Sequence, residues 1–394
     1  ALKEEDVEIL SPNELKSALD WAEVAVDALL GTGMVGILRD PYRTAVALMN
    51  ASRAYKISVD VPSGLDEKGG GECVRADLVV ALHRAKMGLE RFETMVREIG
   101  IPPEAELYMG PGDLVMNLWK RTAESHKGDH GRVLVLGGSD LYHGAPVLSA
   151  MGALYSGADI VYLMVPDANY DVSRTYLPDL IVRKYPGAWF NEAGVKPMLE
   201  LAENCDAVVV GPGLGPRSES AEAVLEFLAR LERPVVVDAE ALKALKGRQD
   251  LLGRSEAVLT PHPGEFLALT GEELPGDSEG RKRAVARWAG VYKAAILLKS
   301  PVDVIAAPDG RVRLNATGNP GMTVGGTGDV LAGLVGGFVA QGLGPFEAAG
   351  CGAFLNGAAG DELYKRKGYG FTASDLAVEL PHTLKGFLDS FGTD

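Results

Sequence analysis

Short apolar runs alternate with amphipathic segments along most of the chain. Apolar runs bounded by Gly, Pro or Asp are typical of buried strands, and apolar residues that recur every three or four positions are typical of helices. The pattern predicts strands at residues 24–30, 55–61, 76–81, 132–136, 159–165, 206–210, 234–238, 257–260 and 294–299. Helices are predicted between them, among others at residues 11–23, 41–53 and 145–156. This alternation indicates an α/β fold with a mostly parallel sheet and helices on both faces.

The segment 315–339 joins a turn to an apolar helix through the sequence Gly325-Gly326-Thr327-Gly328-Asp329. Glycines let the backbone approach a ligand closely, and the unpaired N–H groups at a helix start attract an anion such as phosphate. An aspartate in that turn is poorly suited to binding phosphate alone. We therefore interpret Asp329 as a general base that takes a hydroxyl proton while the turn stabilises charge on the phosphate.

A purely structural interpretation exists for the same glycines. Gly325, Gly333, Gly336 and Gly337 recur at helical spacing, which would allow close helix packing with Asp329 as a charge at the helix start. A short glycine motif alone does not decide between the two interpretations.

Two predicted strands near the N-terminus end in candidate ligand sites. The strand 24–30 runs into a glycine-rich segment at 31–36, and the strand 55–61 contains Asp60 and is followed by Ser63. The carboxyl ends of parallel strands are the usual ligand sites in α/β folds. A simple tight turn in the first case, and an Asx- or Ser-capped turn in the second, are the alternatives.

Further candidates lie at strand ends in the second half of the chain. His262, between two prolines, is either held rigidly where ligands bind or is a structural hydrogen-bonding histidine. Lys299 offers a point charge to a phosphate, unless it is a solvated strand-end lysine. Asp238 either orients bound groups or caps a helix, and Glu265 can equally be a charge at a helix start.

Length and composition favour two globular domains. The chain has 394 residues, of which 46% are hydrophobic. The formal net charge of −15 argues against nucleic acid or an anionic membrane as a partner. The three cysteines lie far apart without CxxC spacing, so we expect a reduced, cytoplasmic protein with neither a disulfide framework nor a zinc site. No apolar run reaches membrane length, and the start at Ala1 has no signal-peptide pattern.

The sequence Asn-Pro-Gly-Met-Thr-Val-Gly-Gly-Thr-Gly-Asp at 319–329 resembles the signature of the ADP- or ATP-dependent NAD(P)H-hydrate dehydratases, which are ribokinase-like. The segments 142–146, 211–215 and 262–265 resemble further motifs of that family. The resemblance implies Asp329 as catalytic base and substrate contacts through Ala145, Gly213, His262 and Asp329. It implies nucleotide contacts through Lys299, Ser300, Pro301, Val302, Asp303, Gly326, Thr327 and Gly328.

The segments 27–33 and 59–66 resemble the NAD(P)H-hydrate epimerase domain, which is often fused in front of the dehydratase. The resemblance implies that Asp27 and Ser63 hold a potassium ion. It implies substrate contacts through Gly31, Thr32, Gly33, Met34, Val35, Gly36, Ile37 and Asp60. The first half of that domain has no counterpart in the sequence, so we expect no complete epimerase site unless the lost half is supplied separately. We expect a partial epimerase-like domain at 1–113 and a dehydratase domain at 114–394.

The sequence as a whole predicts a NAD(P)H-hydrate repair enzyme. The resemblance implies that ADP or ATP, with Mg²⁺, phosphorylates the hydroxyl of hydrated NADH or NADPH, and that loss of phosphate restores the dihydropyridine. ADP is the preferred donor because the fused arrangement is typical of prokaryotic members, and we expect a homo-oligomer. Two alternatives stay open: a ribokinase-like kinase of a vitamin precursor of the hydroxymethylpyrimidine or thiazole type, and a nucleotide-binding protein without turnover.

Overall fold

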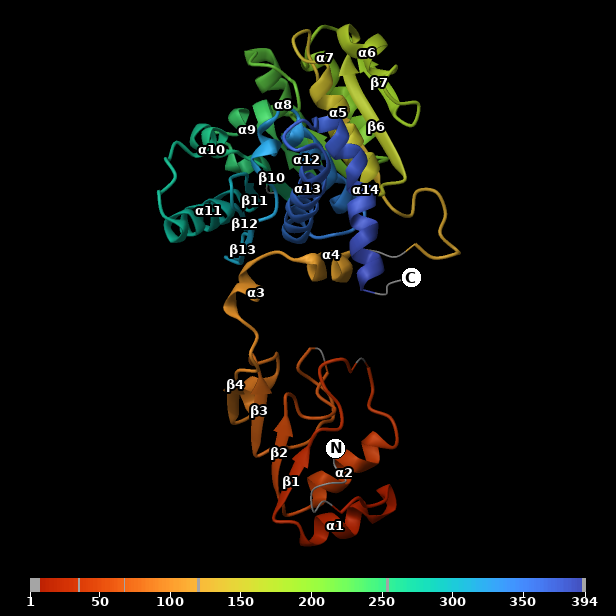
Figure 1. Ribbon diagram of the computed structural model, residues 1–394, viewed down its shortest axis with the longest axis vertical. Coiled ribbons are helices and arrows are strands. Elements are labelled where there is room, and N and C mark those ends of the chain that lie inside the picture. The colour runs from red at the N-terminus through yellow and green to blue at the C-terminus, as the bar shows by residue number, and fades with distance from the viewer. Residues whose placement is uncertain (1–7, 35, 67, 119–120, 253–254, 392–394) are drawn as a thin grey trace. The chain divides into compact units, whose positions relative to one another are not determined.

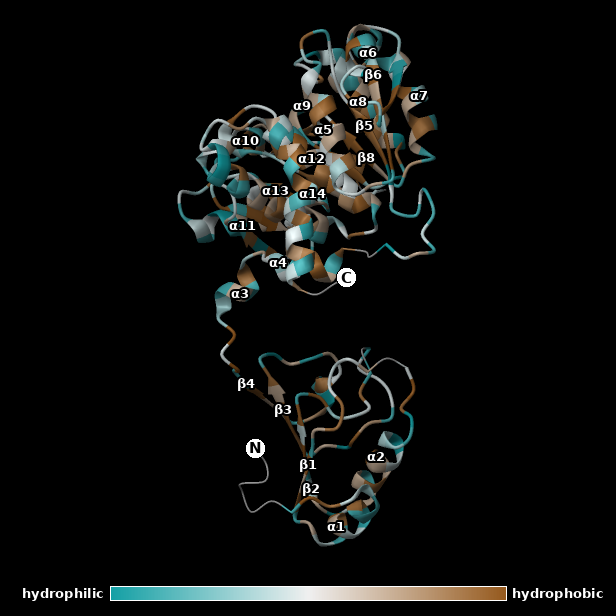
Figure 2. Cartoon of the chain, turned by 45° about the vertical axis from the view of Figure 1, so that its right-hand side comes forward, coloured by the Kyte–Doolittle hydropathy of each residue, from teal (hydrophilic) through white to brown (hydrophobic). Residues whose placement is uncertain are grey.

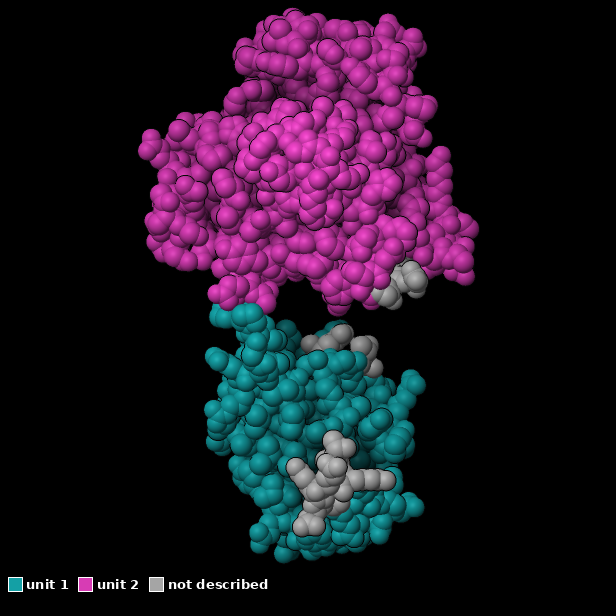
Figure 3. Space-filling view, in the orientation of Figure 1, with its two compact units in different colours: residues 1–103 teal, residues 104–394 magenta. Residues whose placement is uncertain are grey.

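The computed structural model describes residues 8–34, 36–66, 68–118, 121–252 and 255–391, and the chain divides into two compact units (Figure 1). Unit 1 comprises residues 1–103 and unit 2 comprises residues 104–394 (Figure 3). This division lies before the boundary expected at 113/114. One reason is an ion pair of 2.9 Å between Arg313 and Asp113 of α4 (Pro111–Asn117), which ties the segment that follows α3 (Pro103–Leu107) to unit 2.

Unit 1 contains a parallel sheet with the strand order β1-β2-β3-β4. Its strands are β1 (Val24–Asp27), β2 (Tyr55–Val59), β3 (Leu78–Leu82) and β4 (Thr94–Arg97). Its helices are α1 (Leu15–Trp21) and α2 (Tyr42–Ala51), with short 3₁₀ turns at η1 (Pro12–Glu14) and η2 (Leu89–Arg91). Small apolar clusters form its core: Val46 and Met49 of α2 belong to one, and Val79 and Ala81 of β3 to another.

Unit 2 is built on a nine-stranded sheet, counted over the described residues, with the order β13-β12-β11-β10-β9-β8-β5-β6-β7. Neighbouring strands are parallel, except that β12 is antiparallel to both β11 and β13. The strands are β5 (Arg132–Leu136), β6 (Ile160–Pro166), β7 (Ile181–Tyr185), β8 (Ala207–Val210), β9 (Val235–Val237), β10 (Ala257–Leu259), β11 (Ala295–Leu298), β12 (Asp303–Ala306) and β13 (Val312–Asn315). The direction of strand addition reverses between β5 and β8, which makes a switch point there.

Helices cover both faces of this sheet. Val133 and Val135 of β5 belong to an apolar cluster shared with α5, α12, α13 and α14, whereas Leu134 and Leu136 belong to a cluster shared with α7 to α11. Figure 2 shows β5, β6 and β8 in hydrophobic colours, as expected for strands buried on both faces. The helices are α4 (Pro111–Asn117), α5 (Gly144–Tyr155), α6 (Asp167–Ser173), α7 (Glu192–Ala202), α8 (Ser218–Arg230), α9 (Ala239–Ala244), α10 (Pro263–Thr270), α11 (Ser278–Tyr292), α12 (Thr327–Ala340), α13 (Pro345–Lys367) and α14 (Ala373–Ser390), with 3₁₀ turns at η3 (Gln249–Leu252) and η4 (Pro320–Thr323).

The α/β class and each predicted strand are confirmed, with end points shifted by a few residues. The strands that the pattern missed are β4, β7, β12 and β13. Residues 183–184 in β7 and 95–97 in β4 are exposed, so these strands lack a continuous apolar run. β4, β7 and β13 are edge strands, and a strand with solvated side chains escapes a pattern that recognises buried strands. β12 lies inside the sheet and was missed although it is buried, because it has only four residues.

Candidate functional site

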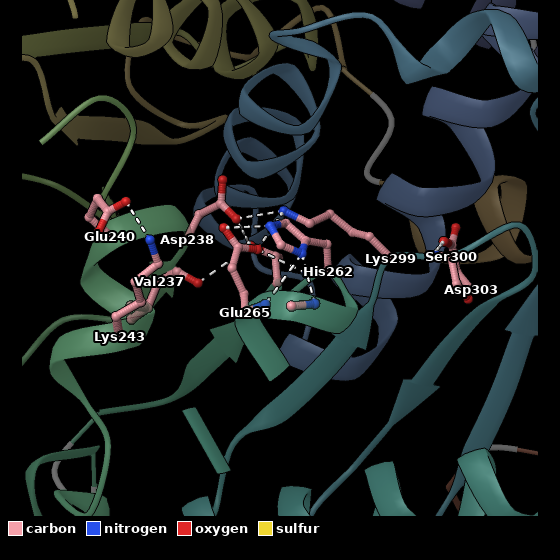
Figure 4. A network of polar contacts seen from close by, with 11 residues as sticks. Val237, Asp238, Glu240, Lys243, His262, Glu265, Lys299, Ser300 and Asp303 are labelled. Carbon is pink, nitrogen blue, oxygen red and sulfur yellow. Dashed lines mark hydrogen bonds and ion pairs between the residues drawn. The ribbon is translucent and has the colours of Figure 1, made fainter. Parts of the chain in front are cut away.

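Three adjacent parallel strands carry polar side chains to one edge of the unit 2 sheet. Asp238 follows β9, His262 comes shortly after β10, and Lys299 follows β11. Because β9 pairs with β10 and β10 with β11, these residues come together at the carboxyl ends of the strands. Figure 4 shows the three side chains converging. This is the edge at which open α/β sheets bind ligands.

Lys299 is an ion-paired residue whose side chain is only 19% exposed. Its Nζ lies 2.8 Å from Asp238 Oδ1 and 3.6 Å from Glu265 Oε2 (Figure 4). Burial alone would lower the pKa of Lys299, but the charges of the neighbouring carboxylates outweigh it and raise the pKa. The interpretation as a solvated strand-end lysine is therefore wrong, and Lys299 is a fixed cation.

Asp238 holds this cation and does not cap a helix. It occupies the N-cap position of α9, yet its side chain makes no cap hydrogen bond. Its Oδ1 instead accepts hydrogen bonds from Thr260 Oγ1 at 2.8 Å and from Lys299 Nζ at 2.8 Å, and the side chain is 3% exposed. Asp238 is thus the buried counter-ion that orients Lys299.

One ring nitrogen of His262, Nδ1, has a structural role, and the other side of the ring is accessible to solvent. Its Nδ1 accepts hydrogen bonds from the backbone N–H groups of Gly264 at 3.0 Å and Glu265 at 3.3 Å, which caps α10. Glu265 completes a capping box by accepting the His262 N–H at 2.9 Å. With Nδ1 as acceptor, the proton of the neutral ring sits on Nε2. The structural alternative is therefore confirmed, and because the side chain is 56% exposed, contact of His262 with a ligand stays a prediction.

The glycines inside α12 serve packing. A Cβ placed on Gly333 would lie 1.7 Å from the carbonyl oxygen of Ser149 in α5, and one on Gly337 would lie 2.0 Å from Ser156 Oγ. A Cβ on Gly336 would meet Val209 at 2.3 Å. The structural interpretation is therefore correct for the interior of the helix.

The glycines of the turn before α12 have different surroundings. A Cβ on Gly325 would meet nothing within 4 Å, and one on Gly328 would lie 3.5 Å from Lys299 Nζ. Gly326 has a φ of +100° and a Cβ there would lie 2.5 Å from Leu148, so this position requires glycine to form the turn. Gly325 and Gly328 are thus open on the side where a ligand would come close to the backbone.

Asp329 lies partly buried in the first turn of α12. Burial, together with the negative charges of Asp238 and Glu265, raises its pKa to about 7, and the positive charge of Lys299 opposes this shift. No hydrogen bond reaches the Asp329 carboxylate from any of the described residues. A carboxyl group with a pKa near neutrality and no protein partner is matched to accepting a proton.

A cavity of about 570 Å³ lies beside this network, within the size range of small-molecule sites. Among the predicted ligand residues, those that line it are His262, Lys299, Ser300, Pro301, Asp303, Thr327 and Gly328. Val302, Gly326 and Asp329 are not in the lining, although Asp329 directly follows Gly328 and interacts electrostatically with Lys299. Thr327 donates its hydroxyl to Met322 O at 2.8 Å, which fixes the turn against the cavity wall.

Asp303 supports the shape of the loop that follows β11. Its Oδ1 accepts the Ser300 N–H at 2.8 Å, and its Oδ2 accepts a hydrogen bond from Asn315 Nδ2 at 3.0 Å. Burial raises the pKa of Asp303 to about 6, although the bonds from Asn315 and Ser300 act in the opposite direction. Both oxygens are engaged by the protein, so Asp303 positions the cavity wall. Val302 is exposed to solvent in the same loop.

Another wall is the segment 317–323, which sequence analysis had assigned only a turn. Asp361 of α13 accepts hydrogen bonds from the Gly318 N–H and from Asn319 Nδ2, both at 2.9 Å. Ala353, Asn356 and Gly357 of α13 also line the cavity. The pattern that could have identified this wall is a run of small and polar positions at helical spacing in an otherwise apolar stretch: Ala353, Asn356, Gly357, Gly360 and Asp361.

Ala145 and Gly213 lie together at the switch point between β5 and β8. A Cβ placed on Gly213 would lie 3.2 Å from Ala145 Cβ. Neither residue lines the cavity described above. Helix α5 nevertheless connects the two places, because Ala145 is in its first turn and its Leu148 packs against Gly326 at the start of α12.

In unit 1, Asp27 and Ser63 are in contact, as the proposed potassium site requires. Asp27 Oδ1 accepts hydrogen bonds from Ser63 Oγ at 2.5 Å and from the Leu29 N–H at 3.4 Å. Its Oδ2 accepts hydrogen bonds from Ser58 Oγ at 2.7 Å and from the Ser63 N–H at 2.8 Å. The carboxylate is completely buried and both oxygens already have protein donors. In this arrangement the pair does not fit a potassium ion.

Asp60 has a partner that sequence analysis missed. Its Oδ1 accepts hydrogen bonds from Lys86 Nζ and from the Leu82 N–H, the latter at 3.1 Å. Lys86 carries no pattern that distinguishes it from other lysines of a loop. The segment predicted to contact substrate is largely exposed at Gly31, Thr32, Gly33, Gly36 and Ile37 and half-buried at Met34, while Val35 lies outside the described residues.

Two kinds of feature are absent from the described part of the chain. No cluster of three or more His, Cys, Asp or Glu side chains in it is arranged to hold a metal ion. No helix there combines the length and apolar character of a membrane span.

Comparison with known proteins places this site in a family. A family model described as NAD(P)H-hydrate dehydratase matches residues 133–382. The chain belongs to the NAD(P)H-hydrate dehydratase family. A second model, described as YjeF-related protein N-terminus, matches residues 1–88. The dehydratase-family match encloses the candidate site from Ala145 to Asp361.

Relatives of this dehydratase-family chain include enzymes named as bifunctional. The chain is 46% identical over 392 residues to the bifunctional NAD(P)H-hydrate repair enzyme Nnr of Pyrobaculum aerophilum, covering 95% of this chain and 77% of that protein. It is 43% identical over 377 residues to the Methanothermobacter thermautotrophicus enzyme of the same name, covering 92% and 72%. Unit 2 resembles the crystal structure of the ADP/ATP-dependent NAD(P)H-hydrate dehydratase of Bacillus subtilis, co-crystallised with ATP and Mg²⁺, with a TM-score of 0.62 and 30% identity over 71% of this chain and 99% of that one.

Proposed function

We propose that unit 2 catalyses the nucleotide-dependent dehydration of (6S)-NAD(P)H hydrate to NAD(P)H. The observation that carries this proposal is the Asp329 carboxyl group, which has a raised pKa and no protein donor and lies at a glycine-rich helix start beside a cavity. The family membership and the names of the relatives support it. An enzyme of this kind must bring an alcohol, a phosphoryl donor and a base together, and this edge of the sheet offers a place for each.

In the proposed reaction, Asp329 takes the proton of the ring hydroxyl as the hydroxyl oxygen attacks the terminal phosphorus of ADP or ATP. The bond from that phosphorus to the rest of the nucleotide breaks, which gives AMP or ADP. The bond from ring carbon to oxygen then breaks and phosphate departs with its electron pair. Loss of a proton from the neighbouring ring carbon restores the double bond of NAD(P)H. Phosphate leaves readily where hydroxide does not, and this is why a nucleotide is consumed.

The helix start stabilises the charge of the transferring phosphoryl group. The backbone N–H groups of Gly326, Thr327 and Gly328 have no partner inside the first turn of α12, and Lys299 adds a fixed positive charge. Removing one such donor typically raises the activation free energy by about 3–4 kcal/mol. Mg²⁺ would neutralise phosphate charge, and it is usually held by phosphates with one or two carboxylates.

The test is an assay of the whole chain with hydrated NADH and either ADP or ATP, followed at the absorbance of NADH. We expect recovery of NADH together with release of phosphate. A stable phosphorylated product from a hydroxymethylpyrimidine or thiazole, without recovery of NADH, would show a kinase instead. Nucleotide binding without any product would contradict the proposal. We propose ADP as the preferred donor, so the rate with ADP should exceed the rate with ATP.

For unit 1 we propose NAD(P)H-hydrate epimerisation, supported by the match over residues 1–88 and by the bifunctional relatives. Binding of potassium at Asp27 would require Ser63 Oγ to turn away from Asp27 Oδ1. Thermal unfolding in KCl and in NaCl tests this: stabilisation by potassium that Ser63→Ala removes would support the site. Equal unfolding temperatures in both salts would contradict it.

We further propose a cytoplasmic homo-oligomer. Cys205 and Cys351 are buried free thiols, and Cys73 is a half-buried one, which suits a reducing compartment. Sedimentation of the full chain tests the oligomeric state, and a species of monomer mass at micromolar concentration would contradict it.

A further inference from the structure

The side chain of Asn356 belongs to the cavity wall, and the oxygen of its amide is buried without a hydrogen-bond partner. The residue is 4% exposed and lines the cavity together with Ala353 and Gly357, its neighbours on the same face of α13. Its Oδ1 has no hydrogen-bond partner among the described residues. Buried side-chain oxygens in native proteins are nearly always paired, so an unpaired one at a cavity wall indicates a missing partner.

The chemistry of this wall selects the kind of partner. Ala353, Asn356 and Gly357 carry no charge, and Leu331 of α12 and Met322 add apolar surface to the same cavity. A phosphate would find no cation on this face of α13. A flat heteroaromatic ring with hydrogen-bonding groups on its edge suits an apolar wall that bears one amide.

A carboxamide pairs especially well with adenine. It offers one acceptor and two donors, and a half-turn about its last torsion exchanges their positions. Asn therefore forms a two-point contact with adenine, accepting from the 6-amino group and donating to the adjacent ring nitrogen. The phosphates would then lie toward Lys299 and Gly328, which line the same cavity.

We infer that Asn356 is the residue that recognises the nucleotide base, with its Oδ1 accepting a hydrogen bond from the adenine 6-amino group. This inference rests on the proposed function in one respect, that the cavity takes an adenine nucleotide. Asn356 thereby determines base specificity and takes no part in the transfer of the phosphoryl group.

The experiment compares ADP with purine riboside 5′-diphosphate, which lacks the 6-amino group, by calorimetry on the wild-type chain and on Asn356→Leu. The wild type should bind ADP about tenfold more tightly than the analogue, the effect of one hydrogen bond to a buried partner. In Asn356→Leu the affinities for ADP and for the analogue should differ by less than about twofold, because the hydrogen bond to the 6-amino group is lost. Asn356→Asp, which keeps an acceptor, should retain most of the preference for ADP.

A merely structural role for Asn356 would give a different result. Leu has the same number of side-chain heavy atoms and the same branching as Asn but no hydrogen-bonding group, so the melting temperature of Asn356→Leu should rise less on addition of ADP than that of the wild type. An unchanged preference for ADP over the analogue in Asn356→Leu would overturn the inference alone. Failure of the wild-type chain to bind ADP would overturn the nucleotide site and the inference with it.

Discussion

Asp27 of unit 1 and Asp329 of unit 2 both lie where α/β folds bind ligands, and their surroundings are opposite. Asp27 ends β1, is completely buried, and accepts hydrogen bonds on both oxygens from Ser58, Ser63 and Leu29. Asp329 begins α12 and accepts no hydrogen bond from the described residues, and burial raises its pKa to about 7.

The difference separates two uses of a carboxylate. A carboxylate surrounded by donors holds its neighbours in place, and its charge is already stabilised by the protein. A carboxylate in a poorly solvated place near other negative charges is left to bind a proton or a ligand. Position at a strand end or helix start is thus not enough to identify a reactive group, because the donors around the carboxylate decide its role.

The largest effect that tests this contrast is expected from Asp329→Asn. It removes the proton acceptor and should lower kcat by about 10²–10⁴-fold while ADP binding is retained. In the wild type, kcat/KM should fall as the pH drops below about 7, because the raised pKa leaves the carboxyl group protonated there. The residual activity of Asp329→Asn should lack this dependence. Glu219→Gln, at an exposed carboxylate in the first turn of α8, is the control, and full activity in Asp329→Asn would refute the role of base.

Lys299→Met should have the next largest effect. The substitution leaves the buried Asp238 without its counter-ion, so unit 2 should lose about 3–5 kcal/mol of stability in denaturant unfolding. Because Lys299 holds the pKa of Asp329 down, the acid limb of the pH–rate profile should also move to higher pH. Lys365→Met, which breaks an exposed ion pair with Glu362, is the control. Adding Asp238→Asn should recover part of the loss, and no recovery would contradict this pairing.

Asp27→Asn tests the other side of the comparison. Replacing one carboxylate oxygen by an NH₂ group places a hydrogen-bond donor opposite the donors of Ser58 or Ser63. The free energy of unfolding of unit 1 should therefore fall by about 1.5–3 kcal/mol. Dehydratase turnover by unit 2 should remain. The matched variant Asp20→Asn, on the exposed side of α1, should unfold like the wild type. If Asp27→Asn unfolded at the same denaturant concentration as Asp20→Asn, Asp27 would not be a structural carboxylate.

The smallest effects distinguish the two groups of glycines within unit 2. Gly333→Ala forces a methyl group against the Ser149 carbonyl and should cost about 1–3 kcal/mol. Gly325→Ala has open space around it and should change stability by less than about 0.5 kcal/mol. If Gly325→Ala nevertheless slows turnover, the turn acts on the ligand. Equal melting temperatures for Gly333→Ala and the wild type would contradict close packing of α12 on α5.

The sequence predicted the parts of the site that lie in short contiguous segments. The glycine turn before α12, His262 after β10 and Lys299 after β11 each stand out from their neighbours. Their partners did not, because the pairing of Asp238 with Lys299 depends on β9, β10 and β11 being adjacent in the sheet. Asn356 escaped for a similar reason, since nothing in the sequence shows that its face of α13 borders a cavity.

The donors around Asp27 were equally invisible in the sequence. Ser58 lies inside β2 and points at a carboxylate on the neighbouring strand, a contact fixed by the register in which Asp27 is opposite Ser58. Strand register is set by the whole pattern of buried residues and not by any one of them. Motif matching therefore found Asp27 and Ser63 as a pair but could not show that the pair was already satisfied.

The backbone contact between α12 and α5 has a consequence for how the protein tolerates change. Where a glycine lies directly on a carbonyl oxygen, the two helices cannot slide or separate independently, so Gly326 and Ala145 move as parts of one rigid body. A methyl group added at Gly333, one helical turn beyond Asp329, would displace the turn at residues 325–329 as directly as a substitution within that turn. Natural variants of this enzyme should therefore keep small residues where α12 contacts α5, even where no substrate atom comes near.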